Sequence, residues 1–199
     1  SERAPGAPPH QRQRVAIAIA EILAHRALDE GDADEALTQI DLVQSSFEAT
    51  GVEGDRMRAL MVLRARAQLE SGDPLAAERT LRPLVGDDAP DDVTTFETLE
   101  LEACCAFADQ RPEVARDLSD QALERLSSGL ETEFGSGAMI RIGTRLGDVL
   151  RDCGDLTRAR DAYDLARHAA VRRLAELDEC LQSLPELSGS TVSEPVLPS

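Results

Sequence analysis

Leu146–Ala166, with the sequence LGDVLRDCGDLTRARDAYDLA, holds one complete helix–turn–helix unit. Gly154-Asp155 divides the unit, because glycine suits the left-handed position that ends one helix and aspartate caps the start of the next. Gly143 and Gly147 lie one turn apart in the first helix, and since a mid-helix glycine costs about 1 kcal/mol relative to alanine, they predict a close helix crossing. The second helix carries an apolar stripe at helical spacing, formed by Leu156, Ala159, Tyr163 and Ala166. The stretch therefore predicts a helical hairpin.

The same arrangement recurs three times upstream. Gly31-Asp32 and Gly72-Asp73 repeat the turn, and Gln110-Arg111-Pro112 replaces it in the third unit. The small residues that follow the four turns are separated by 41, 38 and 44 positions and are Ala36, Ala77, Ala115 and Ala159. A helical pair that recurs at a nearly constant period is typical of an α-solenoid.

This pattern resembles the tetratricopeptide repeat (TPR) family. The family's Leu-Gly pair corresponds to Leu146-Gly147 and its turn glycine to Gly154, while its alanine, aromatic residue and following alanine correspond to Ala159, Tyr163 and Ala166. The period exceeds the usual ~34 residues, so the chain is similar to the divergent, longer-period repeats of bacterial regulators and scaffolds. The resemblance covers about residues 13–170. It implies an all-α, right-handed α-solenoid of about four antiparallel helix pairs with an extended C-terminal helix; a non-repeat helical bundle is the alternative.

Helix start and stop signals predict a repeat domain over residues 11–184. The Pro-rich segment 1–10 is expected to be disordered, and 185–199 to be a flexible tail or a linker. Pro83 should end its helix early, and Asp92 should cap the helix that follows. The expected pairs are 11–30 with 33–49, 55–71 with 74–85, 92–109 with 112–127, and 138–153 with 156–170. A short helical start is also expected around Glu131–Phe134.

No signal stops the last helix at Ala170. It either runs on as one helix of nearly thirty residues or bends into an extra helix before Pro185. Its apolar stripe continues with Leu174, Leu177, Leu181 and Leu184. Such a stripe beyond the last repeat either caps the solenoid or joins a second copy as a homodimer in coiled-coil fashion.

Composition excludes several functions. All 21 basic residues are Arg, and without Lys the chain can hold neither a Walker A lysine nor a pyridoxal Schiff base. A net charge of −17 argues against nucleic acid as a partner, because binding to nucleic acid needs basic surfaces.

The sequence also bears on the compartment. Val15–Ala24 is too short to span a bilayer and is interrupted by Glu21, so we expect no membrane insertion or export and a cytoplasmic protein. The four cysteines show no metal-ligand spacing, which predicts no metal or cofactor and small buried side chains in a reducing compartment.

The charges are unevenly distributed along the chain. Residues 87–102 hold seven acids and no base, whereas residues 141–173 hold eight Arg against five Asp. The interpretation adopted from sequence is that these are solvated helix faces with i,i+4 pairing. Asp148 and Asp152 are expected to pair with Arg145 and Arg151.

The resemblance also implies where a partner would bind, because the first helix of each TPR pair lines the concave face and that face binds peptides. The predicted groove residues are Arg66, Arg141, Arg145, Arg151 and His25. The guanidinium of arginine can bind a carboxylate through two parallel hydrogen bonds, so the partner is expected to carry an acidic segment or a C-terminal carboxylate. The alternative is that these arginines are solvated or paired within the chain.

The sequence thus predicts a protein–protein interaction scaffold or adaptor. It contains no Gly-x-Ser-x-Gly or His-Glu-x-x-His motif and no histidine beside a candidate nucleophile, so we expect no enzyme. The alternative function is a regulatory sensor domain of a larger bacterial signalling or transcription protein that binds a small effector or a peptide.

Overall fold

The computed structural model describes residues 9–50, 54–86, 90, 92–128 and 136–183. Within these residues the chain forms α-helices and no strand, which confirms the all-α prediction. The expected disordered start, the helical start at Glu131–Phe134 and the tail lie largely or wholly outside the described residues. The helices are α1 (Pro9–Asp29), α2 (Ala33–Thr50), α3 (Asp55–Glu70), α4 (Pro74–Leu81), α5 (Val93–Ala108), α6 (Pro112–Ser128), α7 (Ser136–Asp152) and α8 (Leu156–Ser183).

One turn geometry joins the two helices of each pair. In the fourth turn, the Asp155 N–H donates to the carbonyl of Leu150 at 2.8 Å and the Gly154 N–H to that of Arg151 at 2.9 Å. The same two bonds recur in the other three turns, and this Schellman arrangement requires a left-handed residue at its centre. Gly154 supplies it with φ +85°, whereas Gln110 adopts φ +57° in the third turn. The degenerate third turn therefore keeps the geometry without the glycine.

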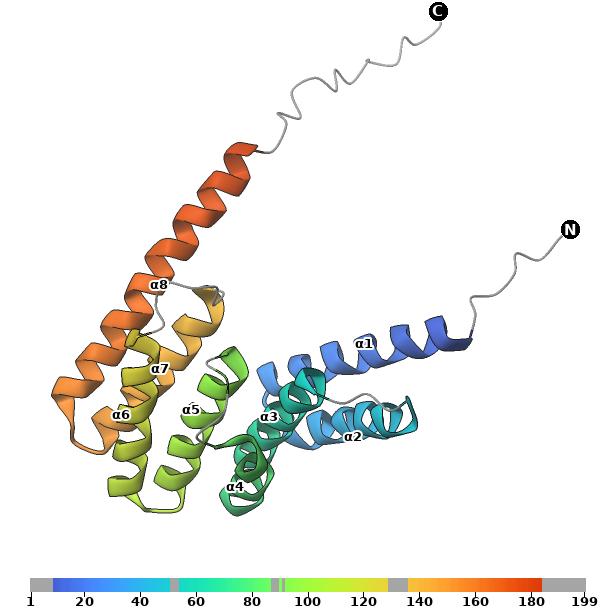
Figure 1. The fold of residues 1–199 in the computed structure, drawn as a ribbon, viewed down its shortest axis with the longest axis horizontal. Coiled ribbons are helices and arrows are strands. Elements are labelled where there is room, and N and C mark those ends of the chain that lie inside the picture. Colours follow the sequence, from blue (N-terminus) through green and yellow to red (C-terminus); the bar gives the residue numbers. More distant parts are fainter. Residues whose placement is uncertain (1–8, 51–53, 87–89, 91, 129–135, 184–199) are drawn as a thin grey trace, which may run out of the picture.

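The four pairs stack into an α-solenoid with two layers of helices (Figure 1). Successive first helices contact one another along the inner layer, from α1 to α3, α5 and α7. The outer helices α2, α4 and α6 pack mainly on the first helix of their own pair and on that of the next pair. Closer packing in one layer curves the stack toward that layer. The inner helices therefore line the concave face.

Gly143 and Gly147 mark the close crossing that the sequence predicts, between α7 and α8. A Cβ atom on Gly147 would lie 2.5 Å from the Tyr163 ring, and one on Gly143 would lie 3.0 Å from the carbonyl oxygen of Ala162. The Tyr163 ring lies against Gly147, and its hydroxyl donates to Asp148 of α7 at 2.7 Å. Glycine at 147 thus makes room for the one tyrosine of the chain.

Two local stop and start signals also act as predicted. α4 ends at Leu81, and a 3₁₀ turn at Arg82–Leu84 carries Pro83. Asp92 caps α5 by accepting the Thr95 N–H at 2.8 Å. Its second oxygen accepts Arg58 of α3 at 2.7 Å, so the cap also fixes α5 against the preceding pair.

α8 is a single helix, which settles the alternative between one long helix and a bent one. Two predictions about it are wrong. Leu156, expected on the apolar stripe, is the first residue of the helix and is exposed. The buried stripe instead includes Ala162, Leu165 and Ala169. Cys180, expected to be buried, is exposed because α8 leaves the body of the molecule after Ala169.

Candidate functional site

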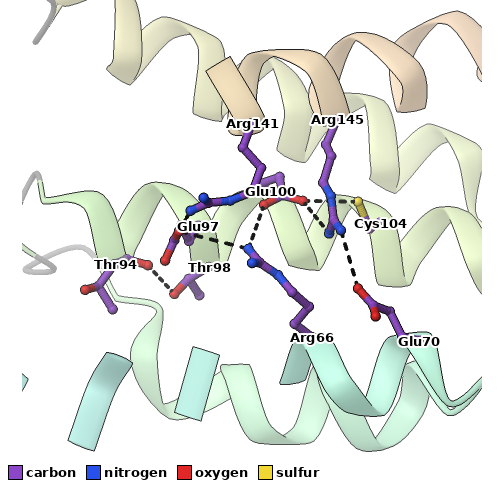
Figure 2. Close-up of polar contacts among 9 residues, drawn as sticks. All are labelled: Arg66, Glu70, Thr94, Glu97, Thr98, Glu100, Cys104, Arg141 and Arg145. Atoms are coloured by element: carbon purple, nitrogen blue, oxygen red, sulfur yellow. Dashed lines mark hydrogen bonds and ion pairs between the residues drawn. The ribbon is translucent and has the colours of Figure 1, made fainter. Parts of the chain in front are cut away.

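Three of the predicted groove arginines meet on the inner face. Arg66 comes from α3, and Arg141 and Arg145 come from α7; all three point at the glutamates of α5, which lies between them (Figure 2). Arg141 contacts Glu97, and Arg145 donates to Glu100 at 3.3 Å. The arginines are therefore paired within the chain, as in the alternative that the sequence left open.

The centre of this cluster is buried. Glu100 is fully buried, and the side chain of Arg66 is 11% exposed. Arg66 lies 3.9 Å from Glu100 and 4.0 Å from Glu97, beyond hydrogen-bonding distance, so their attraction is electrostatic. Arg145 extends the cluster to Glu70 of α3 at 3.5 Å. Three arginines and three glutamates thus tie α3, α5 and α7 together.

Burial sets the titration of the cluster. It raises the pKa of Glu100, although the neighbouring Arg145 and Arg66 oppose the shift. It also lowers the pKa of Arg66, with repulsion from Arg145 and Arg141 adding to the effect. The Cys104 thiol lies 3.7 Å from Glu100, and burial together with that carboxyl raises its pKa, which disfavours a reactive thiolate. The cluster is built to hold helices together.

The interpretation of the acidic segment as a solvated face is wrong for Glu97 and Glu100. α5 is packed between α3 and α7, so its inward side chains cannot reach bulk water freely. The sequence held a signal for this pairing, since the acidic segment 87–102 and the Arg-rich segment 141–173 have complementary charge. The pairing could be inferred only once α5 was known to lie beside α7.

Arg151 lies apart from this cluster, near the end of α7. It pairs with Asp148 at 3.0 Å and with Asp152 at 2.8 Å, as predicted, and about half of its side chain is exposed. Arg145 was expected to share these two aspartates, but it turns to α5 and α3 instead.

His25, the remaining predicted groove residue, lies at a hollow between α1 and α3. The hollow has a volume of about 480 Å³. The buried Leu60 and Leu63 form its apolar floor. The rest of the lining is more exposed and combines the polar side chains Glu21, His25 and Arg56 with the apolar Ala18, Ile22 and Ala59. Ile22 is 66% exposed. The sequence missed Arg56, which belongs to the first turn of α3 and meets its partners only across the repeat boundary.

Arg56 is held at the rim of this hollow by two contacts. It donates to both carboxylate oxygens of Glu21 on α1, at 3.0 and 3.2 Å. Its guanidinium also lies 5.2 Å from the centre of the Phe47 ring of α2, within cation–π range. The Arg56 side chain is still 57% exposed, so it is positioned without being sequestered.

A second apolar surface lies at the N-terminal end of the solenoid, between α1 and α2. A hollow of about 380 Å³ there is lined by residues without charge, including Ile19, Leu23 and Leu42. All three of these side chains are exposed. This hollow interrupts the polar outer surface that is typical of a terminal repeat.

The predicted leucine stripe lies at the opposite end, on the free part of α8. Leu174, Leu177 and Leu181 are exposed, and Leu184 lies outside the described residues. Along the described residues the stripe does not cover the end of the solenoid, where α8 projects beyond α7 (Figure 1).

No group of His, Cys, Asp and Glu side chains among the described residues is arranged to hold a metal ion. The described helices include none with the length and apolarity needed to cross a membrane.

The comparison with curated proteins found no match. A family model described as "Tetratricopeptide repeat-like domain" matches residues 9–182. The match runs from the start of α1 to the last turn of α8 and so includes all four helix pairs. The chain therefore belongs to the family of tetratricopeptide repeat-like domains.

Proposed function

We propose that the chain is a non-catalytic scaffold or adaptor that binds a partner polypeptide on its concave face. The observation that carries this proposal is the hollow between α1 and α3, which combines an apolar floor with three polar side chains at its rim. Binding sites in proteins typically have this composition, since apolar area supplies affinity and a few polar groups fix orientation.

The chemistry of the hollow favours an apolar side chain of the partner with a carboxylate close to it. The apolar side chain would occupy the floor beside Ile22, and the carboxylate would meet Arg56 and His25. Arg56 has donors left for a second carboxylate, because Glu21 engages only one of its terminal nitrogens and its side chain is 57% exposed. On this proposal the acidic segment of the partner would bind at the α1–α3 end of the groove.

The arginines at the other end of the groove contribute less to this proposal. Arg66, Arg141 and Arg145 already have carboxylate partners within the chain. A partner's carboxylate would gain there only by replacing one of these intramolecular contacts, and breaking a buried pair is costly. Arg151, half exposed and beyond the buried cluster, remains available for a peripheral contact.

A polypeptide suits the hollow better than an enclosed small effector does. The hollow of about 480 Å³ is open along the groove and not closed over, so it can take side chains from an extended or helical segment.

The state of the cysteines bears on the compartment. All four cysteines are free thiols, which supports a role in a reducing, cytoplasmic compartment.

The proposal is tested by affinity capture from a cell lysate with mass-spectrometric identification. The compared proteins are the wild type, Ile22→Glu, Arg56→Glu, and Leu75→Glu as a matched control, because Leu75 is a similarly exposed leucine on the outer helix α4. Circular dichroism should show equal helicity for all four. We expect a partner that binds the wild type and Leu75→Glu and that is lost with both hollow variants.

Retention of every partner by both hollow variants would refute the assignment of the α1–α3 hollow. If Leu75→Glu alone lost the partner, the binding surface would be the outer layer and the concave-face proposal would be wrong.

A further inference from the structure

The C-terminal part of α8 is a helix without a packing partner among the described residues. Ala169 is its last buried residue, and residues 171–183 are mostly exposed. Leu174 is 64% exposed, Leu177 43% and Leu181 66%. Single exposed leucines are ordinary, but a row of them on a helix that projects from the body marks an interaction surface.

The spacing of this row is that of a coiled coil. Ala170, Leu174, Leu177 and Leu181 are separated by 4, 3 and 4 residues, which is the alternation of the two core positions of a heptad. Upstream, the first core position of each heptad is an arginine, Arg167 and then Arg160, and the second core position between them is Tyr163, which packs on α7. Two arginines would repel their counterparts in a second copy, so the seam begins at Ala170.

Charged residues beside the seam specify the orientation. With Leu174 and Leu181 at the first core position of the heptad, Arg173 precedes the core on one flank and Asp178 follows it on the other, five residues later. In a parallel pair of helices these two positions face each other across the seam, and in an antiparallel pair they do not. We propose that two copies of the chain associate in parallel through residues 170–183 of α8, with Arg173 of each copy facing Asp178 of the other.

This association exchanges one ion pair for another. In the single chain Arg173 bonds Glu176 of its own helix at 3.2 Å. When Arg173 turns to the second copy, no charge is therefore left buried without a partner.

The seam is short. Two heptads bury less than the roughly 800 Å² per partner of a standard stable interface, so the dimer dissociates on dilution. The dimer also carries two copies of the concave face, so a partner with two binding segments would gain avidity; that consequence alone rests on the proposed function.

Sedimentation across a dilution series tests the association. The expected mass of the wild type falls from twice 21.5 kDa to 21.5 kDa on dilution. Leu177→Glu should be a monomer at every concentration, and Leu75→Glu, an exposed leucine away from α8, should behave as the wild type does. A wild type that stays monomeric at its highest soluble concentration, or a Leu177→Glu variant that dimerises normally, would overturn the proposal.

Charge reversal tests the orientation. Arg173→Glu and Asp178→Arg should each raise the dissociation constant of the dimer about tenfold, because each places like charges in contact twice per dimer. The double variant should restore the wild-type constant. An antiparallel seam predicts no restoration. Leu42→Glu, in the hollow between α1 and α2, should leave the constant unchanged. Loss of assembly with this variant would mean that α8 docks head-to-tail on α1 and α2, and would refute the parallel seam.

Discussion

At the scale of single residues, Glu100 links three helices of the inner layer. It is fully buried and faces Arg66 and Arg145 from two other helices. Glu100→Gln keeps the shape but leaves both arginines without their shared carboxylate. We expect a loss of about 2–4 kcal/mol in the free energy of unfolding, measured by urea denaturation.

The matched control for this change is Asp152→Asn. Asp152 also pairs with an arginine, but both side chains are about half exposed, so the loss should be under about 1 kcal/mol. Equal losses for the two variants would show that the cluster on α5 is solvated.

Gly147 gives a second residue-scale prediction. Alanine normally stabilises a helix interior relative to glycine, but a Cβ atom at position 147 would lie 2.5 Å from Tyr163. Gly147→Ala should therefore destabilise the protein by about 1–3 kcal/mol in thermal denaturation. Gly137→Ala, in the same helix with open space around its Cβ position, should be neutral or slightly stabilising. The close crossing would be disproved if both substitutions stabilised the protein.

Glu102 on α5 makes stability depend on pH. Burial, with a smaller contribution from Glu78, raises its pKa from 4.5 to about 7. Between those values the folded protein keeps a proton that the unfolded chain releases, so stability should fall as the pH rises from about 5 to 7.5. Glu102→Gln should remove this pH-dependent change in the free energy of unfolding, which is on the order of 1 kcal/mol after allowance for solvent screening. Parallel pH profiles of unfolding for the two proteins would contradict this assignment.

At the scale of elements, the third turn offers a test of the repeat. Gln110 holds the left-handed conformation that glycine occupies in the other three turns. Gln110→Gly removes the steric cost of that conformation, so we expect a gain of about 0.5–1 kcal/mol in unfolding free energy. Gly154→Ala, the reverse change in the fourth turn, should lose a similar amount. A loss with Gln110→Gly would mean that the glutamine side chain itself supports the turn.

The sequence predicted the elements well because their signals are local. Turn glycines, capping aspartates such as Asp92, and Pro83 act through their own backbone and a few neighbours. The burial of Glu100 could not be predicted in this way, since it depends on α3 and α7, whose residues lie far from it along the chain. The exposure of Leu156 was missed for the same reason: helical spacing identifies a face but does not say how far a neighbouring helix extends over it.

At the scale of the whole molecule, the solenoid separates a structural region from a candidate binding region. The α3–α5–α7 part of the concave face is closed by paired charges, whereas the α1–α3 part keeps an open hollow. Each end also presents apolar side chains, Leu42 at one and Leu177 at the other. The candidate site could be predicted only in part, because His25 was expected on the groove while Arg56 was not.

The claim that the partner binds at the α1–α3 hollow is tested most directly by site-specific photo-crosslinking. A photoreactive amino acid replaces Ile22 beside the hollow in one protein and Leu75 on the outer layer in another; both positions are exposed. Crosslinks to one polypeptide from position 22, absent from position 75, are the predicted result. Crosslinks to that polypeptide only from position 75 would contradict the claim.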